Sequence, residues 1–498
     1  MPSDSVPLLS KSKFTAGLQC PGRLYRQCYQ RELATPPNAA QRARFAAGNR
    51  FGELARGLYP DGVLISEPAF HHDRAVEHTR SVIAESTGAA IFEGGFTEDS
   101  IRVRADILNK SAIGWELIEV KSSKGAKPEH VPDAAVQLVV LERAGIPIGR
   151  VSIAHLNGNY VHTGGDYVPE QVVSVTDVTD RAREFAKAVP ARVEAMREIL
   201  EADEAPLIEI ESYCKTPYDC EFIDYCRKRE PDWSIEELPR IGDKRRRQLR
   251  VSGVRAIPDI PATFRLTAGQ ERVRQAVTTG KPYVSLDLAA ELERIEPPAH
   301  FIDFETIAPA LPIYAGTKPY EVVPFQWSDH VLTSAGSVGH FEFLADGGGD
   351  PRRKFAESLT ARLADATTII SYGEYERQRL RGIQRSLPDL AESVQDLLDR
   401  PWMNLQKVVS NHYYHPEFHG SYSAKAVLPA VAPDSGYGDL NIQDGELASV
   451  KYIESLDPLM PREQRERVRS DLLAYCERDT WAMVLVVAAL GKAASADN

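Results

Sequence analysis

The sequence predicts an α/β fold made of two α/β segments joined by a small helical connector. In the first segment the strand-like runs are 89–96, 101–108, 115–122 and 150–156, and the helical patterns are 133–145 and 181–202. In the second segment the strands are 301–307, 321–332, 338–343 and 367–372, and the helices are 352–364, 374–386, 422–430, 445–456 and 463–490. Alternation of these two patterns is typical of α/β domains, and 498 residues are enough for two or three cores.

The connector is recognised by its composition. Residues 229–296 are short of regular patterns, basic, and interrupted by Gly and Pro. We therefore expect three domains, at 1–228, 229–296 and 297–498.

The composition is that of an ordinary water-soluble protein, with 43% hydrophobic and 26% charged residues. We find no run of 18 apolar residues and no apolar secretory signal at the start, so we expect a cytoplasmic protein without a membrane span. The formal net charge is −12, so any contact with nucleic acid has to come from local basic patches. The densest such patch is "RIGDKRRRQLR" at 240–250, which is also the pattern of a solvated helix face.

A first group of polar residues lies on two neighbouring strands. Asp106 is on the strand 101–108, and Glu119 and Lys121 share one face of the next strand because they are two residues apart. Two carboxylates that meet across a hairpin can bind Mg²⁺ or Mn²⁺, and a lysine beside them can orient a water molecule or stabilise negative charge. A cross-strand ion pair on the surface is the alternative.

The order of these residues resembles the RecB-type PD-(D/E)xK nucleases. An Asp strand, an "EVK" strand and a helix with Gln137 follow one another as in that family, so the resemblance implies catalytic roles for Asp106, Glu119, Lys121 and Gln137. Two positions depart from the family: Leu141 stands where a tyrosine is common, and the upstream histidine is missing. Glu53 in "NRFGELA" (49–55) is a candidate extra ligand near that position.

Four of the six cysteines are placed at the two ends of this segment. Cys20 lies far upstream, and Cys214, Cys220 and Cys226 follow at six-residue steps. One cysteine before the nuclease core and three after it resemble AddB and the CRISPR-associated RecB-type nucleases, which implies a structural 4Fe–4S cluster. Thiolates suit zinc as well, although the tight C-x₂-C knuckles of zinc sites are absent. Cys28 and Cys476 are expected to be free thiols.

The connector resembles a helix–hairpin–helix element over "ELPRIGDKRRRQLRVSGVRAIPDI" (237–260). Such an element directs backbone N–H groups at a nucleic-acid phosphate without reading bases. Gly242, Lys244 and Arg245 are the phosphate contacts that this resemblance implies. A spacer with a capped turn is the alternative.

A second group of acids begins with "FIDFET" at 301–306. Asp303 and Glu305 share one face of a strand, where two like charges repel each other unless a cation lies between them. Tyr475 and Asp479 are four residues apart on one face of a late helix. The pattern therefore predicts a second metal site.

"DFE" on a first strand and "YxxxD" on a late helix resemble the tyrosine-containing DEDD exonucleases of the ribonuclease-H-like fold. The resemblance implies that Asp303, Glu305 and Asp479 hold two metal ions, that Tyr475 positions the attacking water, and that cleavage runs 3′→5′. The remaining acid is Glu376, with Glu374 as a competing candidate. Residues 297–490 also look like a domain of unknown function that follows RecB-like segments in predicted bacterial nucleases.

Together these patterns predict a metal-dependent nuclease that hydrolyses phosphodiester bonds. DNA is the expected substrate, in repair, recombination or defence, with Mg²⁺ or Mn²⁺ and a 4Fe–4S cluster as cofactors. The alternatives are a nucleic-acid-binding protein with one or both sites inactive, and a ribonuclease.

Overall fold

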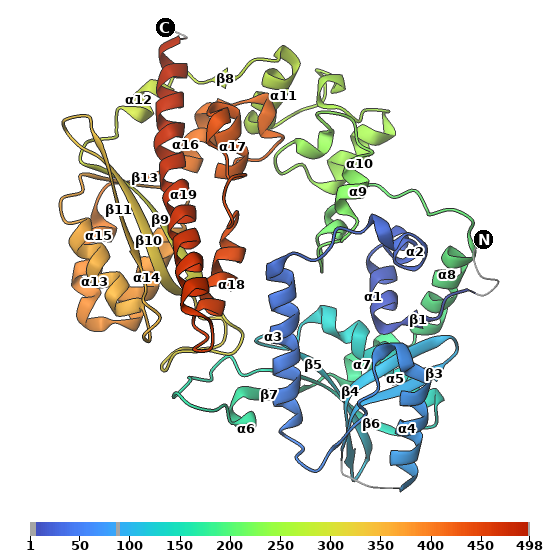
Figure 1. Cartoon of the computed structure of the whole chain (residues 1–498). Helices are drawn as coiled ribbons and strands as arrows, with labels where there is room; N and C mark the ends of the chain where they lie inside the picture. The colour runs from blue at the N-terminus through green and yellow to red at the C-terminus, as the bar shows by residue number, and fades with distance from the viewer. Residues whose placement is uncertain (1–5, 86–89, 497–498) are drawn as a thin grey trace. The chain divides into compact units, whose positions relative to one another are not determined.

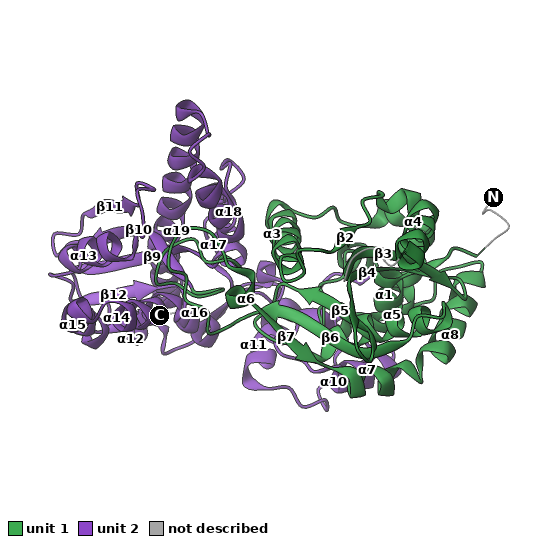
Figure 2. Cartoon of the chain, turned by 90° about the horizontal axis from the view of Figure 1, so that it is seen from below, with its two compact units in different colours: residues 1–229, 309–321 green, residues 230–308, 322–498 purple. Residues whose placement is uncertain are grey.

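Two β-sheets organise the structure, a computed structural model that describes residues 6–85 and 90–496 (Figure 1). The described residues fall into two compact units of mixed α/β structure (Figure 2). Unit 1 comprises residues 1–229 and 309–321, and unit 2 comprises residues 230–308 and 322–498. The mixed α/β class expected from the sequence is confirmed.

The sheet of unit 1 has seven strands in the described part of the chain. Their order is β2–β3–β4–β5–β6–β7, and β1 pairs with β4 in parallel. The strands are β1 (Leu9–Ser10), β2 (Val63–Leu64), β3 (Ala90–Glu98), β4 (Ile101–Ser111), β5 (Gly114–Lys121), β6 (Ile148–Leu156) and β7 (Val173–Asp177). The helices are α1 (Lys11–Gln19), α2 (Pro21–Tyr29), α3 (Ala39–Arg56), α4 (His72–Glu85), α5 (Val131–Arg143), α6 (Pro169–Val172), α7 (Thr179–Ala186), α8 (Val189–Glu201) and α9 (Ile223–Arg227).

Helix α5 connects the parallel strands β5 and β6 and forms the centre of the unit 1 core. A parallel pair needs such a crossover, and a helix that covers a sheet is buried on a wide face. Ala134, Leu138 and Leu141 of α5 are buried in one cluster with Leu117 and Val151 of the sheet. This packing fixes the first turn of α5 beside the end of β5.

The expected helix over 181–202 is two helices, α7 and α8. Pro190 lies in the first turn of α8, where a residue without a backbone N–H is tolerated because that N–H would have no partner within the helix. The proline therefore begins a new helix instead of continuing the old one.

The sheet of unit 2 has five strands in the described part of the chain, in the order β11–β10–β9–β12–β13. Strands β9, β10 and β11 are antiparallel, whereas β9, β12 and β13 are parallel. The strands are β9 (Ala299–Ile307), β10 (Val323–Leu332), β11 (Val338–Leu344), β12 (Thr368–Ser371) and β13 (Trp402–Asn404), and a separate ribbon joins β8 (Tyr283–Val284) and β14 (Tyr413–Tyr414). The helices are α10 (Asp243–Val251), α11 (Ala268–Thr279), α12 (Leu288–Leu292), α13 (Arg352–Arg362), α14 (Tyr375–Ser386), α15 (Ala391–Asp399), α16 (Leu405–His412), α17 (Ala424–Val431), α18 (Gly445–Ser455) and α19 (Arg462–Ala496).

The two faces of β9 have different neighbours. Ile302 and Phe304 pack in a buried cluster with Phe355 of α13 and Leu380 of α14. Helix α19 lies against the opposite face of β9 and β10 (Figure 1). The alternation predicted for "FIDFET" therefore places Asp303 and Glu305 on the side of α19.

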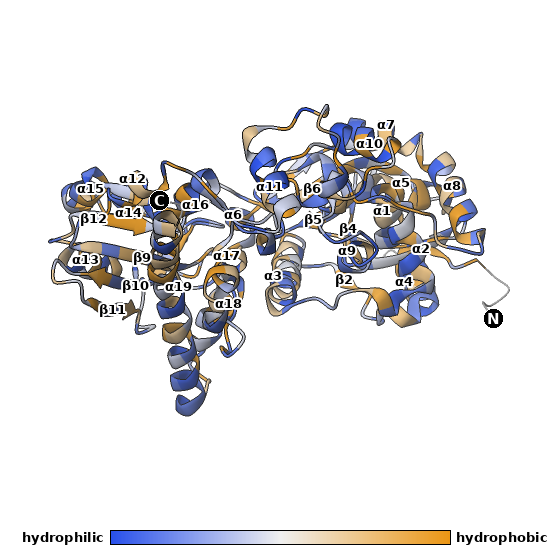
Figure 3. Ribbon diagram, turned by 90° about the horizontal axis from the view of Figure 1, so that it is seen from above, coloured by the Kyte–Doolittle hydropathy of each residue, from blue (hydrophilic) through white to orange (hydrophobic). Residues whose placement is uncertain are grey.

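Helix α19 is long enough and apolar enough to cross a membrane, by its length and composition alone, and 28% of its apolar stretch is buried in the structure. The core helix of a soluble domain can be equally long and apolar. Its first turns are hydrophilic, as the sequence "REQRERVRSD" and Figure 3 show.

The division into units differs from the three expected domains at two places. Residues of the expected connector, among them Ile235, Leu249 and Ile257, share one buried cluster with residues of the second segment such as Phe301 and Tyr414. The segment 309–321, which links β9 to β10, belongs to unit 1 (Figure 2).

The segment 309–321 is held in unit 1 by its backbone and by buried side chains. The His162 N–H donates to the Thr317 carbonyl at 2.9 Å, and the Gly316 N–H donates to the His162 carbonyl at 2.7 Å. The Tyr320 hydroxyl donates to the Ser122 carbonyl, and Ala310 is buried in a cluster of unit 1.

Candidate metal centres

Asp106 and Glu119 face each other at the point where β4 and β5 separate. The antiparallel ladder between the two strands extends to Ile107 and Ile118, so the next residues lie opposite each other. Asp106 Oδ2 accepts a hydrogen bond from the Val120 N–H at 2.7 Å. Glu119 is 1% exposed. The structure thus brings the two predicted carboxylates together.

Lys121 and Gln137 also reach this position. Lys121 Nζ is 2.9 Å from Glu119 Oε1 and forms an ion pair with Asp133. Gln137 Nε2 donates to Glu119 Oε2 at 2.6 Å. Asp133 was not among the predicted residues, although its spacing of four residues from Gln137 places both on one face of α5.

Lys11 is a second cation that the sequence analysis missed. It is the first residue of α1, directly after β1, which pairs with the Asp106-bearing strand β4. Lys11 Nζ donates to both carboxylate oxygens of Glu119, at 2.9 and 3.0 Å, and lies 3.7 Å from Asp106 Oδ1. No local pattern reveals this contact, because Lys11 and Glu119 are 108 residues apart.

The lysine ammonium lies where an ion bridging the two carboxylates would bind. Oxygen ligands surround Mg²⁺ at about 2.0–2.1 Å, so the ion and the ammonium exclude each other. We call the set Asp106, Glu119, Lys121, Gln137, Lys11 and Asp133 the first site. Its donors fit a hard divalent cation once Lys11 has moved.

Burial and neighbouring charges separate the two carboxylates of the first site. Burial, reinforced by the charge of Glu119, raises the pKa of Asp106 to about 7. Burial opposes ionisation of Glu119 too, but Lys11 and Lys121 outweigh it and lower the pKa of Glu119 below its usual range. A cavity of about 950 Å³ opens on Asp106 and Lys121, with Arg44, Arg56 and Glu53 from α3 on its wall.

The four predicted cysteine ligands lie in one neighbourhood of unit 1. Cys20 joins α1 to α2, Cys214 ends a 3₁₀ turn, and Cys226 lies in α9. The Cys220 N–H donates to the Cys214 carbonyl at 3.0 Å. Burial raises the pKa of Cys20 and Cys220, with a further contribution to Cys20 from the charge of Cys226 and to Cys220 from that of Cys20.

The donor type of these thiols fits a soft metal centre, but their positions do not match a preformed zinc site. No three of the sulfur atoms lie within 4.8 Å of one another among the described residues. Four thiolates around one zinc ion at Zn–S distances of about 2.3 Å would be about 3.8 Å apart. Cys28 and Cys476 carry no disulfide in the described structure, and neither do the other four cysteines.

The connector contains less helix than the expected helix–hairpin–helix element. Gly242 caps α10, but only the 3₁₀ turn Ile235–Glu237 precedes it. Lys244 is exposed. Arg245 is half-buried, lies over the Phe264 ring at 4.8 Å and donates to Gln270 Oε1 at 3.1 Å.

Asp303, Glu305 and Asp479 form a second cluster, in unit 2. Gln326 Nε2 of β10 donates to the Leu472 carbonyl at 2.8 Å and fixes α19 over the sheet. One oxygen from each of the three carboxylates lies within 4.8 Å of the others. We call these three acids, with Glu376 and Tyr475, the second site; the structure brings the two strand acids and the helix acid together as predicted.

Two tyrosines hold Asp479. The Tyr437 hydroxyl donates to Asp479 Oδ1 at 2.6 Å, and Tyr475 also hydrogen-bonds this carboxylate. Tyr437 and Cys476 were not predicted: Cys476 Sγ lies 3.6 Å from Asp303 Oδ2. Burial and the charge of Asp479 raise the pKa of the Tyr475 hydroxyl, so it remains a hydrogen-bond donor.

Glu376 and Glu374 turn to different cavities. Glu376 is 4% exposed and lines a cavity of about 440 Å³ together with Asp303, Glu305 and Asp479. It lies outside the 4.8 Å cluster. Glu374 lines another cavity, where it accepts a hydrogen bond from Asn404 Nδ2 at 3.2 Å. Of the two candidates, Glu376 is the one that faces the second site.

The second site concentrates negative charge. Burial, followed by the charge of Asp479, raises the pKa of Asp303 and Glu305 well above the usual range. Burial raises the pKa of Glu376 to about 7. Among the described residues neither Asp303 nor Glu305 forms an ion pair with a lysine or arginine, and Lys425 is the cation whose charge reaches Glu305. The donor set fits a hard divalent cation.

Comparison with known proteins places the acids of β9 in a defined family region. The fold is mixed α/β, and residues 300–423 match the model of a domain of unknown function, DUF2779. This confirms the expected domain of unknown function over that range, which contains Asp303, Glu305 and Glu376 but ends before Tyr475 and Asp479. No curated protein matches the chain, and the comparisons identify no nuclease family.

Proposed function

We propose that the protein is a metal-dependent nuclease with a RecB-like site in unit 1 and a DEDD-type exonuclease site in unit 2. The observation that carries the proposal is the convergence of Asp303, Glu305 and Asp479 within 4.8 Å, with Tyr475 bonded to Asp479. Buried carboxylates whose pKa values are raised by one another are a recognised mark of a functional site.

At the second site Asp303, Glu305 and Asp479 would hold divalent ions, with Glu376 at the edge of the same cavity. Bound Mg²⁺ or Mn²⁺ would supply an activated water molecule and neutralise charge on the phosphoryl oxygens. The Tyr475 hydroxyl stays protonated and orients the water by hydrogen bonding, while Tyr437 keeps Asp479 in place.

At the first site Asp106 and Glu119 would hold the ion, and Lys121 would stabilise developing negative charge. Gln137 orients Glu119 through the 2.6 Å hydrogen bond. Asp133 fixes the ammonium of Lys121. The chain's own residues thus position both the ligands and the lysine.

The proposed substrate is nucleic acid, with DNA as the first choice because both resemblances point to DNA-processing enzymes. The net charge of −12 requires local cations, and Arg44 and Arg56 supply them on the wall of the first cavity. Residues 240–250 add a basic segment in unit 2. A 4Fe–4S cluster on Cys20, Cys214, Cys220 and Cys226 is proposed as a structural clamp, with zinc as the alternative metal.

A second candidate function is nucleic-acid binding without cleavage at the first site. The position of Lys11 between Asp106 and Glu119 favours it, because the ammonium satisfies both carboxylates without an ion. This alternative applies to unit 1 alone.

The test uses the full chain with labelled single- and double-stranded DNA and RNA, in Mg²⁺ or Mn²⁺. We expect hydrolysis by the wild type, loss of one activity in Asp106→Asn, loss of the other in Asp303→Asn, and none in the double variant. Wild-type protein that degrades none of the four substrates would overturn the proposal. Hydrolysis of RNA alone would establish the ribonuclease alternative.

The metal of the cysteine centre is tested separately. Anaerobically purified protein is expected to be brown and to contain iron. Colourless protein with one zinc ion per chain would show that the cysteines bind zinc and not an iron–sulfur cluster.

A further inference from the structure

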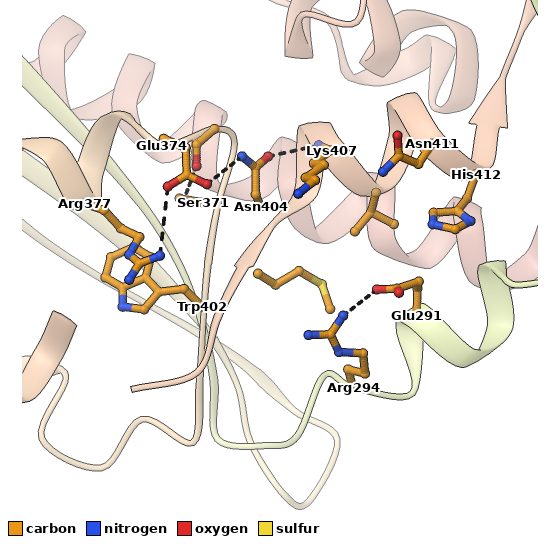
Figure 4. A pocket seen from close by; sticks show the side chains of 13 residues that line it. Glu291, Arg294, Ser371, Glu374, Arg377, Trp402, Asn404, Lys407, Asn411 and His412 are labelled. Atoms are coloured by element: carbon orange, nitrogen blue, oxygen red, sulfur yellow. Dashed lines mark hydrogen bonds and ion pairs between the residues drawn. The ribbon is translucent and has the colours of Figure 1, made fainter. Parts of the chain in front are cut away.

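A polar cavity of about 270 Å³ lies at the carboxyl ends of β12 and β13 in unit 2 (Figure 4). Its walls come from α12, from the turn between β12 and α14, and from one face of α16 with the residue that precedes it. Residues Asn404, Lys407, Val408 and Asn411 form that face at helical spacing. Ligands of α/β sheets commonly bind outside the carboxyl ends of parallel strands.

Several hydrogen-bonding groups of this cavity have no protein partner. Among the described residues, no hydrogen bond or ion pair involves the ammonium of Lys407 or the side-chain amide of Asn411. The Nε of Arg377 and the Nδ1 of His412 are buried and have no hydrogen-bond partner. Figure 4 shows Lys407 and Asn411 on the same helix, across the cavity from Arg294. Buried polar atoms without a partner carry a cost that a ligand can remove, and here this applies to the Arg377 and His412 atoms, because Lys407 and Asn411 are exposed.

The charge balance of the cavity favours an anion. Arg294 Nη1 forms an ion pair with Glu291 at 2.8 Å, and Arg377 Nη1 lies 4.0 Å from Glu374 Oε2. The three cations of the wall therefore exceed its two acids by one, and the cation without a partner is Lys407. A lysine is a good point-charge partner for a phosphate.

The wall also offers groups for more than a bare phosphate. Trp402 presents an aromatic ring beside Arg377, whose guanidinium lies 5.5 Å from the ring centroid. Asn404, Asn411 and Glu374 offer amide and carboxylate groups of the kind that bind base edges. The volume of about 270 Å³ lies just below the range of drug-sized sites and limits the ligand to one nucleotide.

The cavity is a neighbour of the second site and shares a wall with it. Residues 371–376 separate the two: Ser371, Gly373 and Glu374 line this cavity, whereas Tyr372, Tyr375 and Glu376 line the other. Ser371 Oγ donates to the Gly373 carbonyl at 3.0 Å and so fixes the first part of this segment. A ligand here would therefore lie one chain segment away from the proposed hydrolysis.

We propose that this cavity is a subsite for a nucleoside monophosphate. Lys407 and Arg377 hold its phosphate, and the side-chain amides of Asn404 and Asn411 hold its base. The proposal rests on the proposed function of the second site, because hydrolysis from a strand end releases nucleoside monophosphates. The subsite makes the enzyme sensitive to its own product.

The test measures binding of dTMP, inorganic phosphate and thymidine to the full chain by calorimetry in EDTA, in an Asp303→Asn background that lacks one of the three acids of the second-site cluster. We expect dTMP to bind, phosphate to bind at least tenfold more weakly, and thymidine not to bind. Lys407→Gln should weaken dTMP binding at least tenfold. The matched control is Lys451→Gln, at a half-buried lysine of the same unit that is paired with Glu454 at 2.8 Å, and it should leave dTMP binding unchanged.

Melting curves of both variants establish that they fold, and Asn411→Ala provides a second substitution in the wall. Absence of dTMP binding, equal binding of phosphate and dTMP, or equal effects of Lys407→Gln and Lys451→Gln would each overturn the subsite. If the wild type hydrolyses no nucleic acid but dTMP binding depends on Lys407, the nuclease proposal fails and the subsite stands. If hydrolysis proceeds but dTMP does not bind, the subsite fails and the nuclease proposal stands.

Discussion

At Glu119 two ammonium groups lie against one buried carboxylate, whereas Asp303 and Glu305 share their surroundings with further acids and no ion-paired lysine or arginine among the described residues. The acids of the first pair lie on the adjacent strands β4 and β5, and those of the second pair lie two residues apart on β9. In the first site the counter-charge is built into the chain. In the second site a proton or a bound cation has to supply it.

This difference teaches that similar carboxylate pairs need not depend equally on metal. The first site should be stable without an ion and resist its entry, because Lys11 has to be displaced. The second site should be strained without an ion and bind one readily. The following experiments, from the largest expected effect to the smallest, compare the two.

Glu119→Gln gives the largest expected effect. It removes the buried carboxylate that Lys11 and Lys121 share and leaves them only Asp106 and Asp133, and breaking a buried ion pair in this way costs about 3 kcal/mol. Urea denaturation of metal-free protein measures the loss. The control Glu129→Gln removes a half-buried acid 3.8 Å from the exposed Lys127 and should cost less than about 0.5 kcal/mol. Equal stability of the two variants would contradict the idea that Lys11 and Lys121 balance the charge of Glu119.

The second site predicts a dependence of stability on pH in metal-free protein. The pKa of Glu376 is raised from 4.5 to about 7, so the folded state binds the proton more tightly than the unfolded state. Its contribution is present below pH 4.5 and is lost as the pH rises through 7, by about 3 kcal/mol. Melting in EDTA between pH 4.5 and 8 measures the slope. Glu376→Gln should reduce the slope by this contribution, while Asp106, Asp303 and Glu305, whose pKa values are also raised, keep theirs. A slope unchanged in the variant would show that the charge resides elsewhere.

Asp303→Asn should change the stability of metal-free protein in the opposite direction from Glu119→Gln. It removes one of several repelling carboxylates and should stabilise metal-free protein on the order of 1–2 kcal/mol. The same variant should lose the rise in melting temperature that Mn²⁺ gives to the wild type. Destabilisation in EDTA would mean that other groups in the metal-free protein already balance the charge of Asp303.

Lys11→Ala should raise the affinity of the first site for Mn²⁺ about tenfold, which corresponds to about 1.4 kcal/mol. The reason is that the ion no longer competes with an ammonium for the same oxygens. Calorimetry in the Asp303→Asn background isolates this site. Unchanged or weaker binding would show that Lys11 assists the ion.

Glu374→Gln should have the smallest effect, within about twofold on the activity of the second site, since Glu374 lines the other cavity. Glu376→Gln is the matched comparison and should reduce that activity about a hundredfold. If Glu374→Gln instead causes the large loss of activity and Glu376→Gln the small one, Glu374 belongs to the second site.

Much of this arrangement could be predicted because it depends on local spacing. The period of two places Asp303 and Glu305 on one face of β9, and the period of the helix places Tyr475 and Asp479 together on α19. Both pairs were identified on this basis. The choice of Glu376 over Glu374 was settled by the structure, because Glu374 precedes α14 and Glu376 lies in its first turn, so that no single period covers both residues.

The missed residues are those that tertiary packing brings in. Lys11 reaches Glu119 through a pairing of β1 with β4, and Tyr437 reaches Asp479 from an irregular segment. Neither belongs to a periodic pattern around its partner. The short strand β13 and the helix α16 were also missed, although they form most of the cavity at Lys407.

The segment 309–321 has a practical consequence for cutting the protein into pieces. The chain passes between the units at residues 229/230, 308/309 and 321/322, so no single cut separates them. A fragment beginning at 230 would carry Ala310 and Tyr320 as an orphaned loop, and a fragment ending at 229 would leave the backbone of His162 without its partners. Truncation at any one junction therefore divides unit 1 or unit 2 between the two pieces.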